Sequence, residues 1–149
     1  MRSRSQTLIA SCLTSLSLMP AAYAGGERLL TGEELQLLFP GLVAHFDRGV
    51  NTKELKYLSD GRLERSVLFK KQVGPTSGKW RIKGNKMCFR WSAWPDSKPD
   101  QCNRFGLEGV TDTVNEIDFG ALKGKQLLVF KKDGSILNKA KIEGKKSEE

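Results

Sequence analysis

The segment from Trp80 to Trp91 constrains the fold more than any other feature of this sequence. At its centre, Gly84-Asn85 is a pair of residues that suits the two-residue loop of a tight β-hairpin. Such a loop pairs Ile82 with Met87 and Trp80 with Phe89, so apolar side chains meet throughout. Alternation predicts one face made of Trp80, Ile82, Met87, Phe89 and Trp91, and an opposite face made of Lys79, Arg81, Lys83, Lys86, Cys88 and Arg90.

Other turn signals extend this pattern along the chain. Ser59-Asp60-Gly61 and Asp133-Gly134 also separate short strand-like segments, and no helical periodicity follows residue 40. We expect seven or eight strands. The predicted fold class is mainly β, with a short N-terminal helix followed by a small antiparallel β-barrel or sandwich, for which a lipocalin-like meander is one candidate.

The helix is predicted at residues 31–39. Thr31 is a suitable N-cap, and Glu34, three residues later, completes a capping box. Pro40-Gly41 then ends the helix. We expect a single domain over residues 25–143 and a flexible polar tail over residues 144–149.

The first 24 residues have the pattern of a secretory signal peptide. Arg2 and Arg4 precede an uncharged segment, Thr7–Met19, and the small residues of Ala22-Tyr23-Ala24 suit a signal peptidase. Cleavage near Ala24 predicts a periplasmic or secreted protein without a transmembrane segment. Lipidation at Cys12 is the less favoured alternative, because the apolar segment continues beyond that residue.

The cysteine pattern agrees with export. Cleavage would leave Cys88 and Cys102, an even number in an oxidising compartment, and this favours a disulfide between them. Alternation within Gln101–Leu107 directs Phe105 and Leu107 inward and Cys102 outward. Both cysteines therefore lie on outward faces, which predicts a bridge at the surface.

The charge distribution suggests a binding surface. Lys and Arg outnumber Asp and Glu by 25 to 17, and Glu64 is the only acid between Arg62 and Arg90. An exported basic face would attract an anionic envelope polymer or an acidic protein, whereas nucleic acid is not expected. Trp94 either anchors a partner or folds back onto the barrel. The predicted binding surface comprises Lys79, Arg81, Lys83, Lys86, Arg90 and Trp94.

Several of these features together resemble a known group of proteins. Leu30-Thr31-Gly32-Glu33-Glu34-Leu35, Asp60-Gly61, Gly78-x-Trp80, Cys88-Phe89-x-Trp91 and Cys102 follow one another in the order typical of small exported proteobacterial proteins that are grouped as domains of unknown function. The resemblance covers about Leu30 to Phe105. It implies a periplasmic or secreted β domain with a Cys88–Cys102 bridge, and it supplies no catalytic residue.

Two other function classes remain open. The apolar face of Trp80, Ile82, Met87, Phe89 and Trp91 is also a candidate interior site for a small apolar ligand. A hydrolase would need a pair of carboxylates, such as Asp47 with Glu54 or Asp112 with Glu116.

The sequence offers little for other chemistry. His45 is the only histidine and has no accompanying nucleophile motif. We therefore assign no catalytic residue, no metal site and no cofactor, and we expect a non-enzymatic binding protein.

Overall fold

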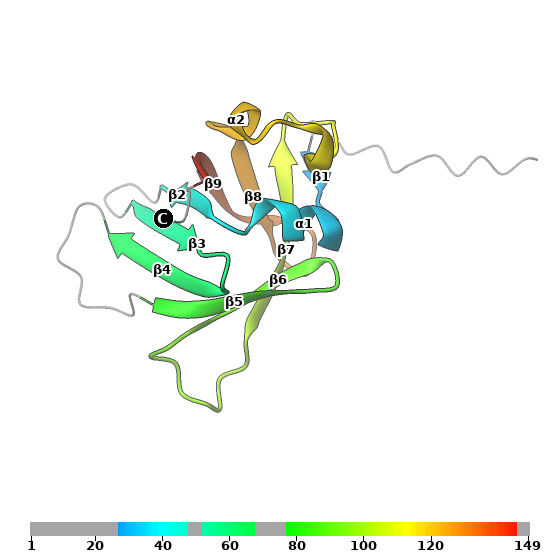
Figure 1. Ribbon diagram of the computed structural model, residues 1–149. Helices are drawn as coiled ribbons and strands as arrows, with labels where there is room; N and C mark the ends of the chain where they lie inside the picture. The colour runs from blue at the N-terminus through cyan, green and yellow to red at the C-terminus, as the bar shows by residue number, and fades with distance from the viewer. Residues whose placement is uncertain (1–26, 48–51, 68–76, 146–149) are drawn as a thin grey trace, which may run out of the picture.

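The computed structural model describes residues 27–47, 52–67 and 77–145 of the 149-residue chain. The predicted signal peptide lies outside the described residues. Nine antiparallel strands lie within them, and eight of these close into a barrel (Figure 1). The strands are β1 (Glu27–Leu29), β2 (Leu42–Phe46), β3 (Lys53–Tyr57), β4 (Arg62–Val67), β5 (Ser77–Lys83), β6 (Lys86–Trp91), β7 (Gln101–Glu108), β8 (Gln126–Phe130) and β9 (Ile136–Lys145).

The barrel is an up-and-down meander. Each strand from β2 to β9 pairs with the next along the chain, and β9 returns to pair with β2. Strand β1 extends the edge of β7 beyond β6, with Arg28 opposite Leu107. The predicted mainly β class is confirmed, and the architecture is a closed barrel rather than a sandwich.

The hairpin of β5 and β6 has the register expected from the sequence. Ile82 lies opposite Met87, and Trp80 lies opposite Phe89. The turn needs glycine at its first position because Gly84 has a φ of 59°. The sequence pattern therefore predicted both the turn and the face of every residue in this hairpin.

Helix α1 (Gly32–Leu38) covers one end of the barrel, which we call the closed end. Thr31 caps it, and Glu34 completes the predicted capping box. The amide of Gly32 donates to Asn85 Oδ1 over 2.8 Å, so the β5–β6 turn also supports this helix terminus. A Cβ at Gly32 would lie 2.2 Å from the Gly84 carbonyl oxygen, which explains why glycine stands there.

An ionic network joins α1 to the neighbouring chain at the closed end. The carboxylate of Glu34 is buried and pairs with Arg28, and it also accepts from the amides of Thr31 and Val114. Burial would raise the pKa of Glu34, but the hydrogen bonds from Thr31, Arg28 and Val114 outweigh it and lower that pKa. The guanidinium of Arg28 also donates to the Asp112 carbonyl oxygen over 2.6 Å. The network therefore binds α1, β1 and the β7–β8 connection together.

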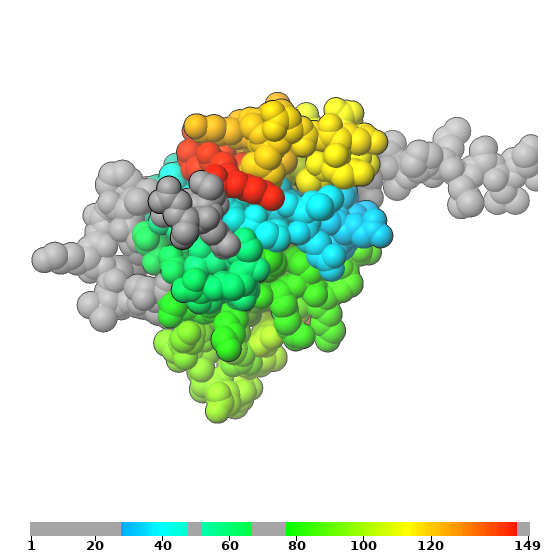
Figure 2. All heavy atoms as spheres, viewed as in Figure 1, coloured from blue at the N-terminus to red at the C-terminus, as the bar shows by residue number. Residues whose placement is uncertain are grey.

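That connection contains two short helical segments that the sequence analysis did not anticipate. They are a 3-10 helix, η1 (Val114–Glu116), and α2 (Phe119–Leu122). Both are too short to show a helical period in the sequence. Figure 2 shows α1 between this connection and the green strands β5 and β6, so both flank the helix at the closed end.

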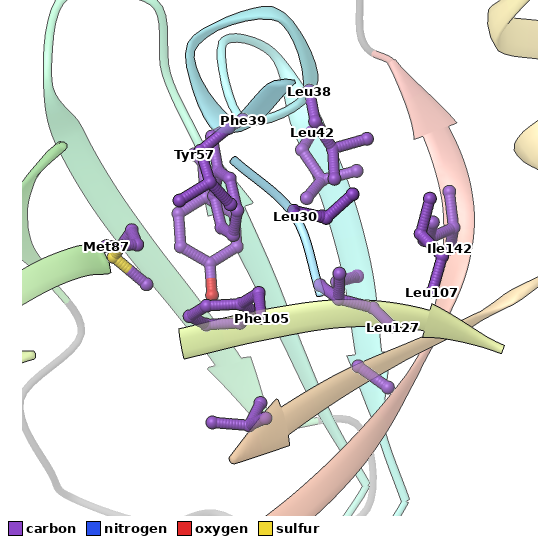
Figure 3. Close-up of a cluster of buried hydrophobic side chains, with 14 of the residues drawn as sticks. Leu30, Leu38, Phe39, Leu42, Tyr57, Met87, Phe105, Leu107, Leu127 and Ile142 are labelled. Atoms are coloured by element: carbon purple, nitrogen blue, oxygen red, sulfur yellow. The ribbon is translucent and has the colours of Figure 1, made fainter. Parts of the chain in front are cut away.

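The core is densest beneath α1. Leu35, Leu38 and Phe39 of this segment are fully buried, and each such side chain contributes about 1.5–3 kcal/mol of transfer free energy. The Phe39 ring lies 4.8 Å from Tyr57 and 5.0 Å from Phe105, centroid to centroid, both edge-on (Figure 3). The helix is thus a plug whose apolar face completes the barrel core.

The end of the domain differs from the prediction. Strand β9 continues through Lys145, where Gly144 pairs with Val43 and Lys145 pairs with Leu42. The first two residues of the predicted tail therefore belong to the strand that closes the barrel. Their polar sequence concealed this role, because backbone pairing with β2 needs no apolar side chain.

Candidate functional site

A cavity of about 170 Å³ opens at the barrel end opposite α1, which we call the open end. Side chains from seven of the eight barrel strands line it, namely β2, β3, β4, β6, β7, β8 and β9. Aromatic rings form much of the wall, including Phe89 and Trp91 of β6. A cavity of about 150 Å³ lined by apolar side chains is known to accept benzene, so this space suits a single six-membered ring. The lining aromatic residues are Phe46, Tyr57, Phe89, Trp91 and Phe105.

Tyr57 joins the cavity to the packed core. It is 2% exposed, and its ring forms a cluster with those of Phe39 and Trp80, in which the centroids lie 4.8 to 6.2 Å apart. Figure 3 shows its hydroxyl directed toward Phe105, away from α1. Within the described residues this hydroxyl makes no hydrogen bond, although it belongs to a residue that lines the cavity. The hydroxyl is not among the fully buried polar atoms without a partner, of which the described residues contain Arg104 Nε, so it is accessible from the cavity and can donate to a ligand there.

Burial also determines the protonation state of Tyr57. It raises the pKa of the phenol because the anion would lose its hydration. The hydroxyl is therefore a hydrogen-bond donor at every physiological pH.

The rim of the cavity is cationic. Lys53 of β3 and Arg65 of β4 both line it, and none of its lining residues is acidic. The guanidinium carbon of Arg65 lies 4.9 Å from the centroid of the Trp91 ring. A cation–π contact of this kind fixes the plane of the guanidinium while its N–H edges remain available. Arg65 thus presents an oriented positive charge at the entrance.

Three amide side chains complete the polar part of the wall. Asn103 donates to the carbonyl oxygen of Phe130 over 3.1 Å and accepts from Gln101 over 3.3 Å. Asn138 of β9 lines the same cavity. Asn103 is therefore held by its neighbours, and this part of the wall is fixed before any ligand enters.

The residues predicted for the barrel interior differ in whether they line the cavity. Met87, Phe89 and Trp91 line the cavity. Trp80 and Ile82 pack against the core toward the closed end, where the Trp80 indole donates to the Leu58 carbonyl oxygen over 2.9 Å. Alternation identified their common face, but it carries no information about depth along the barrel axis.

The predicted basic face is partly neutralised by the β6–β7 connection, which projects at the bottom of Figure 1. Asp100 pairs with Arg90 over 2.7 Å and with Arg81 over 3.3 Å. The hydrogen bond and charge of Arg90, with the charge of Arg81, lower the pKa of Asp100. Arg90 also donates to the carbonyl oxygens of Pro95 and Lys98. Both arginines thus hold a loop in place.

The lysines of that face are placed differently. Lys79, Lys83 and Lys86 are exposed, and Lys83 lies directly opposite Lys86 across the hairpin. No ion pair of these three is found within the described part of the chain. Like charges at opposed positions repel, so this end of the hairpin has excess positive potential.

Trp94 folds back toward the barrel. Its ring lies 5.6 Å from Phe89, and the Lys98 ammonium sits 3.7 Å above it. The side chain is partly buried and packs against the core. Of the two alternatives for Trp94, the structure shows the folded-back arrangement.

The predicted disulfide is present in the structure. Cys88 and Cys102 face each other across β6 and β7, with their sulfur atoms bonded and their Cα atoms 4.0 Å apart. The bridge lies on the outer face, as predicted, with Cys102 partly exposed and Cys88 fully buried beneath its neighbours. Cys88 lies between its cross-strand neighbours Arg81 and Cys102, and these cover it.

His45 and Glu54, two of the residues considered for catalysis, lie on the outer face of β2 and β3, beside Glu143 of β9. His45 contacts Glu54 over 2.7 Å and Glu143 over 3.1 Å. The hydrogen bond from His45, aided by Lys56, lowers the pKa of Glu54. A general acid for sugar hydrolysis needs the opposite shift. Asp112 contributes its carbonyl oxygen to the Arg28 network, and no contact between Asp112 and Glu116 brings the second suggested pair together among the described residues.

Several cavity residues were missed by the sequence analysis. Tyr57 and Arg65 lie on adjacent strands whose inward positions mix polar and apolar side chains, and this obscures the alternation. The available sequence signal was the spacing of two residues between Leu55 and Tyr57 and between Leu63 and Arg65, which places each pair on one face of its strand. A charged residue such as Arg65 can be assigned to an inward face only when the structure of the closed barrel is known.

Neither the overall features of the described residues nor comparison with known proteins assigns a function to this chain. Among the described residues, no helix combines the length and apolarity needed to cross a membrane, and no cluster of three His, Cys, Asp or Glu side chains is arranged to hold a metal ion. No family model, curated protein or solved structure matches the chain.

Proposed function

We propose that this protein binds a small molecule in the cavity at the open end of its barrel. The observation that supports this most strongly is a cavity of about 170 Å³ whose lining combines aromatic rings with the Arg65 cation and Tyr57. Natural barrels that serve only as scaffolds fill this space with side chains. Here a rigid aromatic wall, an oriented cation and an unused donor converge, as they do in ligand sites.

The test uses four monocyclic probes: phenol, benzamide, benzoate and 4-hydroxybenzoate. Ligand-observed NMR and calorimetry should detect saturable binding of at least one probe with a stoichiometry of one. Leu55→Trp should abolish this binding, because Leu55 lines the cavity and a larger ring would fill it.

A matched control is available on the other side of the molecule. Leu37→Trp makes the same change on α1 at a side chain that is 49% exposed, and it should leave binding intact. The proposal fails if no probe binds, or if Leu55→Trp binds as well as the unchanged protein.

A second candidate function is binding of an anionic envelope polymer through the hairpin. It is favoured by the opposed pair Lys83 and Lys86, with Lys79 on the same face. Association with dextran sulfate should then weaken as salt rises, and Lys83→Glu with Lys86→Glu should remove it. The same double reversal at Lys123 and Lys125, which are exposed beside α2, is the control. Equal loss in both variants would indicate attraction by net charge alone.

A further inference from the structure

The chemistry of the cavity also restricts which small molecule fits it. Its two charged lining residues, Lys53 and Arg65, are both cations, and its lining contains no carboxylate. Among the described residues Arg65 contacts the Trp91 ring and forms no ion pair. A partly buried guanidinium without an anion has lost hydration that no carboxylate replaces. Arg65 is therefore a cation for which a ligand can supply the anionic partner.

The aromatic wall restricts the body of the ligand. The Arg65 guanidinium lies over the Trp91 ring. The centroids of the Phe89 and Trp91 rings are 6.0 Å apart, and their planes are inclined by 67°. A flat ring gains most from such walls, because face and edge contacts are both available. A cationic ring is disfavoured, because the cavity rim repels it.

The strand register offsets the two polar residues of the cavity along the barrel wall. Arg65 lies opposite Leu55, and Tyr57 is two residues further along the same strand. Two residues of a strand advance by about 7 Å. Arg65 and Tyr57 line the same cavity at positions offset along the wall, so a ring with polar substituents at opposite ends can address both side chains.

We infer that the ligand is a small aromatic carboxylate with a polar substituent at the opposite end of the ring. Its carboxylate pairs with Arg65 at the rim, its ring lies against Trp91 and Phe89, and its far substituent accepts a hydrogen bond from Tyr57. This inference rests on the proposed function and specifies the ligand class of the same cavity.

The first test compares benzoate with benzamide, which has nearly the same shape and no charge. Calorimetry should show benzoate binding about tenfold more tightly, as expected for a charge-assisted pair. Arg65→Gln should reduce this preference to about twofold or less, and Arg65→Lys should retain part of it. Lys79→Gln removes an equal charge from the outer face and should leave the preference unchanged.

The outcomes separate the two proposals. Equal binding of benzoate and benzamide would overturn the ligand class and leave the cavity as a binding site. A preference that survives Arg65→Gln would also overturn it. Failure of both probes to bind would count against the proposed function itself.

The second test concerns the inner end of the ligand. Tyr57→Phe should weaken the binding of 4-hydroxybenzoate by about threefold to tenfold, because the 4-hydroxyl oxygen of the ligand loses its hydrogen-bond donor. Benzoate, which has no far oxygen, should bind this variant as well as it binds the unchanged protein. Equal weakening of both ligands would show that Tyr57 acts on the shape of the cavity, and would overturn its role as a donor.

Discussion

The two ends of the barrel handle their polar groups in opposite ways. At the closed end, the buried carboxylate of Glu34 accepts from Arg28 and from two backbone amides. At the open end, Arg65 lies over the Trp91 ring and forms no ion pair among the described residues, and Tyr57 lines the cavity. Under the proposed function, the closed end holds the fold together and the open end is available for a ligand.

The largest difference between the ends should appear in the aromatic core. Phe39→Ala removes a fully buried ring beneath α1 and should lower the free energy of unfolding by about 3–5 kcal/mol. Phe89→Ala removes a partly buried ring that already borders a cavity, and about 1–2 kcal/mol is expected. Urea denaturation measures both. Equal losses would mean that the open end is as important for stability as the closed end.

The ionic network at the closed end should have the next largest effect. Glu34→Gln keeps the shape of the side chain but removes its charge opposite Arg28, which should cost about 1–3 kcal/mol at neutral pH. Arg28 is partly exposed and can regain some hydration, which limits the loss. Stability equal to that of the unchanged protein would show that the network does not hold α1.

The same variant gives a pH signature. The pKa of Glu34 is lowered in the folded state, so its contribution is fully present above the unfolded value of 4.5 and is lost as pH falls through the lower folded value. Acid should therefore destabilise the unchanged protein more steeply than Glu34→Gln below about pH 4.5. Parallel pH profiles for the two proteins would contradict the assigned pKa direction.

The smallest effect on stability is expected at the rim. Arg65→Gln and Lys79→Gln should each change the free energy of unfolding by less than about 0.5 kcal/mol, because neither side chain has an ion pair among the described residues to lose. A slight gain for Arg65→Gln would sharpen the comparison, since removing an unpaired charge relieves a cost. A loss above about 1 kcal/mol would place Arg65 among the residues that hold the fold.

The sequence predicted the closed end better than the open end for a physical reason. The capping box of Thr31 with Glu34 and the turn at Gly84 are local features, and neighbours in the chain determine them. The cavity instead depends on barrel closure, which brings β3 and β4 near β6, β7 and β9. Inward polar residues such as Arg65 break the alternation that would have identified them.

The charges of the hairpin show a second limit of sequence patterns. Alternation placed Arg81 and Arg90 on the outer face correctly, but the pairing of both with Asp100 follows from the path of the β6–β7 connection. Likewise, Trp80 was assigned to the right face while its depth was unknown. Periodicity defines the face of a residue, whereas partners and depth depend on the tertiary fold.

Two tryptophan indoles allow the most direct test of the difference between the two ends. Trp91 lines the cavity, whereas the Trp80 indole N–H donates a hydrogen bond to the Leu58 carbonyl oxygen near the closed end. In ¹H–¹⁵N NMR spectra recorded during titration with 4-hydroxybenzoate, the Trp91 indole signal should shift in a saturable manner while the Trp80 signal stays in place. Equal shifts of both signals, or a shift of Trp80 alone, would contradict the assignment of ligand binding to the open end.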